Sequence, residues 1–193
     1  MKKESQVIFD KNVIEFVTVA AEFCAFLERA ESMKRSTFVD TTLKILPLLY
    51  LKASMLPKCE MIGDESPETY VTEEIYEVLR INLASILVEK DDYLEVFLPD
   101  MAYSDEPIKK NISEDLADIY QDIKDFIFVF QLGLNETMND SLAICQENFG
   151  LLWGQKLVNT MRALHDVKYS PKARGEDEEE EEYEPENNED CHC

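Results

Sequence analysis

Residues 113–130 carry the clearest helical periodicity in the chain. Their apolar side chains recur every three or four positions and share one face of an α-helix: Leu116, Ile119, Tyr120, Ile123, Ile127 and Phe130. Four aspartates recur with the same period on roughly the opposite side: Asp115, Asp118, Asp122 and Asp125. This pattern predicts a helix with Ser113 as its N-cap and Gly133 as its C-cap, whose acidic stripe faces solvent.

Helical spacing also occurs in four other stretches, which are residues 10–31, 36–56, 72–90 and 137–166. The second of these is apolar on most sides, so we expect it to be the central helix, kinked at Pro47. Asp40 is placed to complete a capping box at its start. We expect a short helical turn at residues 91–97 and long loops at residues 58–70 and 98–110, which contain prolines.

Glycine is scarce, at 5 residues in 193, as expected for long uninterrupted helices. We therefore predict an all-α fold, with residues 1–170 forming a single compact bundle of about five to six mostly antiparallel helices. Residues 171–193 carry 11 acidic and 2 basic residues and too few apolar ones to form a core. They are expected to be a disordered acidic tail.

The formal net charge of −22 restricts the partners that the protein can have. Residues 1–170 alone hold 30 acidic and 17 basic residues, so the helical part is acidic in its own right. Nucleic acids and anionic membrane surfaces attract lysine and arginine clusters, and both would repel this chain. A protein partner with a basic surface is compatible with the charge, and the oligomeric state is left open.

The sequence contains no segment typical of secretion or membrane insertion. Two lysines follow Met1, but Asp10, Lys11 and Glu15 interrupt the apolar run that a signal peptide needs. No window approaches about 18 uncharged apolar residues. The cysteines number 5, an odd count without the spacing of a disulfide framework, so we expect a reducing, cytoplasmic setting.

No catalytic set can be assembled from the sequence. The chain has two histidines, His165 and His192, and no Gly-rich phosphate loop, so we expect no cofactor. The terminal Cys191-His192-Cys193 offers three soft ligands, whereas a structural zinc site uses four on a folded frame, so no metal site is expected. The candidate binding residues are instead taken from helix surfaces, and they are Asp115, Asp118, Asp122, Trp153 and Arg162.

Two hypotheses for function remain open. The first is a non-enzymatic protein that acts by binding a protein partner. The second follows from an EExxE sequence at residues 73–77 and an ExxD sequence at residues 89–92, which resemble the metal-binding signature of MazG-like all-α nucleotide pyrophosphatases. Glu77 and Glu89 would lie about 18 Å apart on one helix and could not share a metal. A Mg²⁺- or Mn²⁺-dependent phosphohydrolase would therefore need acids from two helices: Glu73, Glu77, Asp118 and Asp122.

Several segments together resemble a bacterial family catalogued as domain of unknown function 5063. These segments are residues 46–53, 92–97, 112–120 and 153–165. The resemblance covers roughly residues 10–168 and leaves out the acidic tail. It implies an all-α fold in a bacterial cytoplasm, and it implies no established activity.

Overall fold

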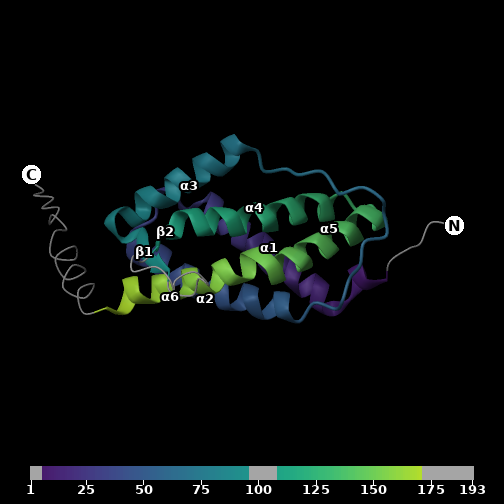
Figure 1. Ribbon diagram of the computed structural model, residues 1–193, viewed down its shortest axis with the longest axis horizontal. Coiled ribbons are helices and arrows are strands. Elements are labelled where there is room, and N and C mark those ends of the chain that lie inside the picture. The colour runs from purple at the N-terminus through teal and green to yellow at the C-terminus, as the bar shows by residue number, and fades with distance from the viewer. Residues whose placement is uncertain (1–5, 96–107, 171–193) are drawn as a thin grey trace, which may run out of the picture.

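The chain folds into helices and one β-hairpin, as seen in a computed structural model that describes residues 6–95 and 108–170 (Figure 1). The α-helices are α1 (Lys11–Glu28), α2 (Arg35–Ser54), α3 (Glu73–Leu87), α4 (Ile112–Gln131), α5 (Asn135–Asn148) and α6 (Gly154–Tyr169). A π-helix (Phe149–Trp153) joins α5 to α6, and short 3-10 turns lie at Val7–Phe9, Ala30–Ser32 and Val88–Lys90. The predicted all-α class is confirmed.

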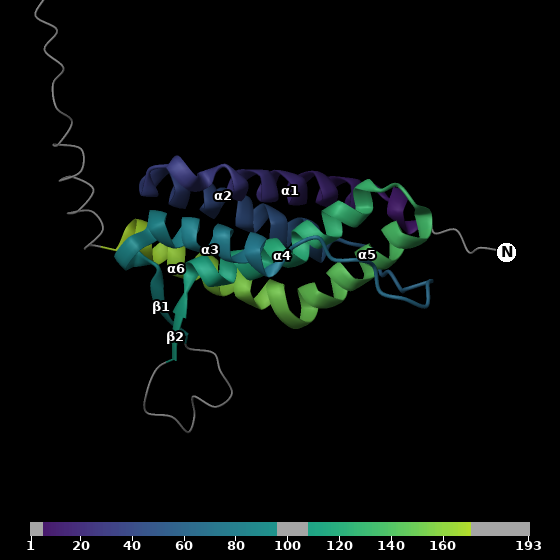
Figure 2. The same ribbon diagram turned by 90° about the horizontal axis from the view of Figure 1, so that it is seen from above.

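The helix at the centre of the bundle is α4, which packs against α1, α3, α5 and α6. Figure 2 shows α1 and α2 on one side of the bundle and the α5–α6 rod on the other, with α4 between them. The prediction that residues 36–56 form the central helix is wrong. Leu48 and Leu51 of α2 are 43% and 51% exposed, because only one side of this outer helix contacts the core.

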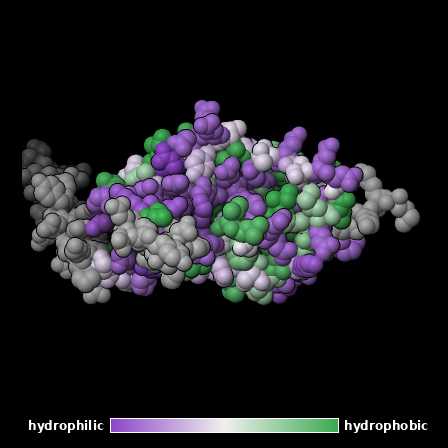
Figure 3. Space-filling view, in the orientation of Figure 1, coloured by the Kyte–Doolittle hydropathy of each residue, from purple (hydrophilic) through white to green (hydrophobic). Residues whose placement is uncertain are grey.

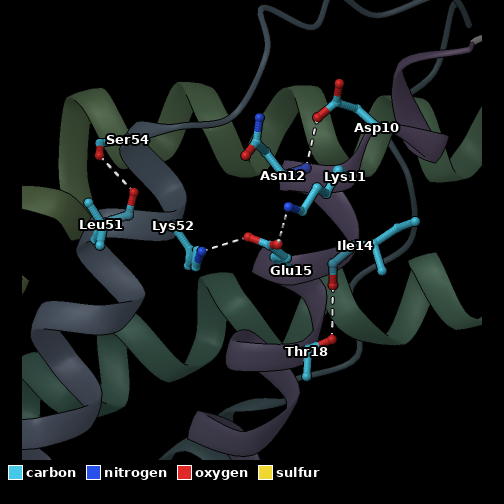
Figure 4. Close-up of polar contacts among 9 residues, drawn as sticks. All are labelled: Asp10, Lys11, Asn12, Ile14, Glu15, Thr18, Leu51, Lys52 and Ser54. Carbon is cyan, nitrogen blue, oxygen red and sulfur yellow. Dashed lines mark hydrogen bonds and ion pairs between the residues drawn. The ribbon is translucent and has the colours of Figure 1, made fainter.

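Polar contacts at the helix ends explain where several helices begin and end. Asp10 is the N-cap of α1 and accepts a hydrogen bond from the Asn12 N–H at 2.8 Å (Figure 4). Glu15 of α1 pairs with Lys52 of α2 at 2.6 Å, which links the two helices. The predicted capping box of α2 is wrong, since Lys34 precedes the helix without a side-chain cap and Asp40 pairs with Lys44 and Lys168.

Residues 91–95 differ most from their predicted conformation. The expected helical turn is instead strand β1 (Asp92–Glu95), which pairs antiparallel with β2 (Ile108–Asn111), with Tyr93 opposite Lys110. The hairpin extends from the bundle near the ends of α3 and α6 (Figure 2). Of the predicted loop at 98–110, residues 98–107 lie outside the described residues.

Asp91, directly before β1, takes over the role predicted for Ser113. Helix α4 begins at Ile112, so Ser113 lies inside its first turn and is not the N-cap. The Asp91 carboxylate accepts hydrogen bonds from the Ser113 N–H and hydroxyl, both at 2.7 Å. A side chain from another segment thus satisfies a free N–H of the helix start. At the other end, the C-cap is Leu132, so the predicted cap is displaced by one position, and Gly133 follows it with a φ of +75°, the left-handed conformation that commonly ends a helix.

The core is formed by aliphatic and aromatic side chains of all six α-helices and the π-helix. Phe16 of α1, Phe126 of α4 and Trp153 of the π-helix meet in it, with ring centroids 5.5 to 6.5 Å apart. In the described part of the chain, no helix combines the length and apolar character that a membrane crossing requires.

Candidate functional site

The aspartate stripe of α4 is not the solvent-exposed face that its spacing predicts. Because α4 is surrounded by other elements, each carboxylate contacts a neighbour. Asp115 accepts a hydrogen bond from the Tyr93 hydroxyl at 2.5 Å, and only 4% of the residue is exposed. Asp118 accepts one from the Tyr76 hydroxyl at 2.8 Å and also pairs with Lys156.

The other two aspartates contact α5 and the segment that precedes α3. Asp122 Oδ1 accepts a hydrogen bond from Asn148 Nδ2 at 2.6 Å. Asp125 Oδ1 accepts two, from the backbone N–H groups of Tyr70 and Val71, at 2.7 and 2.8 Å. All four carboxylates therefore connect α4 to different neighbouring elements.

Three of these aspartates line a pocket of about 420 Å³ between α4 and the α5–α6 rod. Asp118, Asp122 and Asp125 form its acidic wall, and the segment 67–69 forms part of its rim. The remaining lining combines apolar side chains with amide, hydroxyl and ammonium groups, and consists of Gln121, Phe126, Val129, Ser141, Ile144, Cys145, Asn148, Leu152, Trp153 and Lys156. A volume in the range of roughly 300 to 1,000 Å³ is typical of ligand sites.

Burial changes the titration of two carboxylates in this pocket, those of Asp122 and Asp125. Loss of solvation raises the pKa of Asp122 above its ordinary value, and the negative charges of Asp125 and Asp118 act in the same direction. Burial also raises the pKa of Asp125. Asp122 Oδ2 and Asp125 Oδ2 have no hydrogen-bond donor among the described residues. The pocket thus holds acceptor oxygens that a cationic donor could satisfy.

Lys156 is the one basic residue among the described residues that line the pocket. Burial by itself would lower the pKa of its ammonium group, but the contact with Asp118 outweighs burial and raises that pKa. Lys156 therefore stays charged and neutralises part of the acidic wall, while Asp122 and Asp125 form no ion pair in the described part of the chain.

The π-helix determines which side chains reach the pocket. One π-turn shifts the register of the α5–α6 rod, and Leu152 in this turn is 52% exposed and lies at the pocket. Trp153 is fully buried, and its indole N–H donates to the Cys145 carbonyl at 3.1 Å. A Cβ atom at Gly154 would lie 2.3 Å from the Phe149 carbonyl oxygen, so this turn requires glycine.

The predicted binding residues separate into three groups. Asp118, Asp122 and Trp153 come together at the pocket, although Trp153 is buried and not at the surface. Asp115 is also buried rather than at the surface, and it lies next to the hairpin outside the pocket lining. Arg162 is exposed and lines a separate shallow groove with His165 and Tyr169.

The sequence interpretation missed Lys156, Asn148 and the segment 67–69 as parts of the site. Lys156 follows Trp153 by three positions, a spacing that places both on one side of a helix, and this was a usable signal. The segment 67–69 offered no such signal, because a loop has no periodicity that places it over a helix.

The acids required by the phosphohydrolase hypothesis do not converge. Glu77 pairs with Arg80 on its own helix at 2.7 Å, and Asp118 pairs with Lys156. In the described ranges, no three His, Cys, Asp or Glu side chains are grouped as a metal site requires. The geometry on which that hypothesis depends is therefore not found for Glu73, Glu77, Asp118 and Asp122.

Comparison with known proteins matches residues 7–170 to the family described as domain of unknown function (DUF5063), which confirms the resemblance seen in the sequence. Among solved structures, the chain is similar to protein BF1032 from Bacteroides fragilis, a structural genomics target, with 92% sequence identity and a TM-score of 0.79. The match covers 88% of this chain and 99% of that one. No protein with a curated functional description matches.

Proposed function

We propose that this chain, which belongs to the DUF5063 family, is a non-enzymatic binding protein that receives a basic side chain of a partner protein in the pocket between α4 and the π-helix. The observation that supports this most is the unbalanced charge of the pocket. Among the described residues, three aspartates line it beside a single lysine, burial raises the pKa of Asp122, and one oxygen of that carboxylate has no hydrogen-bond donor.

An arginine or lysine of the partner would fit the chemistry of this wall. Its charged nitrogens would donate to Asp122 and to the neighbouring carboxylates of the wall, Asp118 and Asp125, and a hydrogen bond between charged groups contributes about 1.5–3 kcal/mol. Its aliphatic stem would pack on Leu152, Phe126 and Val129. The net charge of −22 would also attract a basic surface and speed its encounter with the protein.

The surface beside the pocket favours a protein over a small free cation. Leu152, which lines the pocket, is 52% exposed, and Leu151, next to it in the π-helix, is 70% exposed. Figure 3 shows hydrophobic residues gathered where α5, the π-helix and α6 meet. Exposed apolar surface beside a polar site is typical of protein interfaces. Apolar residues of the partner, next to its basic side chain, could cover this exposed surface.

A cytoplasmic setting belongs to the same proposal. Cys24, Cys59 and Cys145 are free thiols, and burial raises the pKa of each, which keeps them protonated and unreactive. Thiols of this kind persist in a reducing compartment.

The proposal is tested with a set of labelled peptides in which one central arginine or lysine is flanked by leucine and other apolar residues. Binding is measured by fluorescence polarisation at low and moderate salt. We expect Asp122→Asn to weaken binding by about tenfold, because each tenfold change corresponds to about 1.4 kcal/mol and one charged contact is lost. Glu22→Gln, which removes the same charge from an exposed position on α1, should change binding by less than about twofold.

Two results would overturn the proposal. The first is that no basic peptide binds, or that Asp122→Asn behaves like Glu22→Gln. The second is that free arginine or a linear polyamine binds as tightly as the best peptide, which would make the pocket a small-molecule site.

A further inference from the structure

Lys156 already places an ammonium group in the acidic pocket. It extends from α6, one turn after the π-helix, and pairs with Asp118 Oδ2. Its side chain is 34% exposed, so the group is open to the pocket and to solvent. The chain's own lysine therefore occupies part of the space and of the acidic wall that a partner's basic side chain would use.

A second carboxylate lies within reach of the same ammonium group. Asp115 Oδ1 is 4.0 Å from Lys156 Nζ, while Asp115 Oδ2 accepts the Tyr93 hydroxyl. Asp115 precedes Asp118 by three positions, so both carboxylates lie on the same side of α4. Burial raises the pKa of Asp115, which means that its charge lacks full compensation.

We propose that Lys156 is an internal competitor: its ammonium group occupies Asp118 in the free protein, and an incoming basic side chain displaces it toward Asp115. The inference rests on the proposed function of the pocket. Because Asp115 Oδ1 is 4.0 Å away, a movement of about 1 Å toward it brings the ammonium to a normal hydrogen-bond distance of roughly 2.8 Å and loosens its contact with Asp118. The lysine keeps a charged partner throughout, so the exchange avoids burying an unpaired charge.

A competitor and a structural support predict opposite effects of removing the lysine. If Lys156 competes, its loss frees the Asp118 oxygen and leaves the pocket more negative, so a basic ligand binds more tightly. If Lys156 only supports the fold, its loss leaves Asp118 without a cationic partner and weakens both the fold and the binding.

The test compares Lys156→Met with Lys52→Met, using the basic peptide that binds the unmodified protein most tightly. Lys52 pairs with Glu15 on the far side of the bundle and is 20% exposed, so its loss changes the net charge equally without touching the pocket. We expect Lys156→Met to tighten binding by about five- to tenfold and Lys52→Met by less than twofold. Lys156→Arg, which keeps the charge, should bind no more tightly than the unmodified protein.

The outcomes separate this inference from the function on which it rests. If Asp122→Asn weakens binding but Lys156→Met fails to tighten it beyond Lys52→Met, the competitor role is overturned and the pocket remains the binding site. If Asp122→Asn has no effect, the proposed function itself fails. Circular dichroism melting of each variant confirms folding, and Lys156→Gln replaces Lys156→Met if the latter does not fold, with the same expected tightening.

Discussion

At the scale of single residues, Asp122 is expected to destabilise the free protein. Its pKa is raised by burial, so the folded state holds this proton more tightly than the unfolded chain does. At neutral pH the ionised group therefore favours unfolding. Asp122→Asn keeps the acceptor for Asn148 and removes the charge, so we expect the free energy of unfolding at pH 7 to rise by about 1 kcal/mol.

The pH dependence of this effect has a definite sign. As pH falls through the raised pKa toward the ordinary value of 3.8, the folded-state carboxyl becomes neutral, and the advantage of Asp122→Asn should disappear. Urea unfolding at pH 7 and near pH 4 measures the difference. A variant that is less stable at pH 7, or equally stabilised at both pH values, would contradict the assignment.

Asp40 should respond to the same substitution in the opposite direction. Hydrogen bonds from Lys168 and Lys44 lower its pKa to about 2, so its charge stabilises the folded state. That contribution is fully present above the ordinary value of 3.8 and is lost as pH falls through about 2. Asp40→Asn should therefore lower stability at pH 7, and the loss should vanish toward pH 2. Both substitutions can be followed in one urea series, and effects of equal sign at pH 7 would be inconsistent with this account.

The contrast within the aspartate stripe shows what residue spacing leaves undetermined. Asp115, Asp118, Asp122 and Asp125 share one period, and the sequence predicts one exposed face for all of them. Whether a charged stripe faces water depends on how many helices surround it. That property belongs to the assembled bundle, and no residue in the stripe encodes it.

At the scale of elements, the π-helix predicts opposite outcomes for two glycines four positions apart. A Cβ at Gly154 would contact the Phe149 carbonyl oxygen at 2.3 Å, whereas a Cβ at Gly150 would meet nothing within 4 Å. Gly154→Ala should therefore destabilise the protein by about 2–4 kcal/mol. Gly150→Ala should stabilise it by about 0.5–1 kcal/mol, because alanine loses less backbone entropy in a helix.

Thermal unfolding measures both glycine variants, with Gly150→Ala as the matched control. The fluorescence of Trp153, the single tryptophan, reports on the same turn and should change in Gly154→Ala only. Equal stabilities for the two variants would mean that the π-turn is not the preferred conformation of this segment.

Long elements were predictable from the sequence, whereas short ones were not. The periodicity of α1, α3 and α4 extends over four or more turns and predicts each helix, with ends displaced by a few residues. The π-turn involves five residues, and β1 and β2 involve four each. So few positions cannot establish a period, and the cap that Asp91 provides across 22 residues has no local signature.

At the scale of the whole molecule, the helical class was predictable, but the helix at the centre was not. Residues 36–56 are apolar on most sides, which is typical of a buried helix, yet Leu48 and Leu51 of α2 and its C-cap Met55 are exposed. The hydropathy of a segment shows how many apolar side chains it has. It does not show whether they pack in the protein's own core or form an exposed surface that a partner could cover. The exposed apolar residues of α2 are therefore the reason why residues 36–56 were wrongly predicted to be the central helix.

The net charge of the molecule predicts opposite effects of salt on stability and on binding. The acidic residues exceed the basic ones by 22, and this excess repels itself in the folded state. Added salt screens that repulsion, so raising NaCl from about 20 to 300 mM should raise the melting temperature by a few degrees. Individual surface ion pairs contribute about 0–1 kcal/mol each and would not reverse this trend.

Over the same range, binding of the basic peptide should weaken by about threefold or more, because its attraction is screened as well. Calorimetry and fluorescence polarisation on one dilution series provide the two measurements. Salt-independent binding would show that the ligand is recognised through its apolar part alone, and a melting temperature that falls with salt would show that ion pairs outweigh the self-repulsion of the chain.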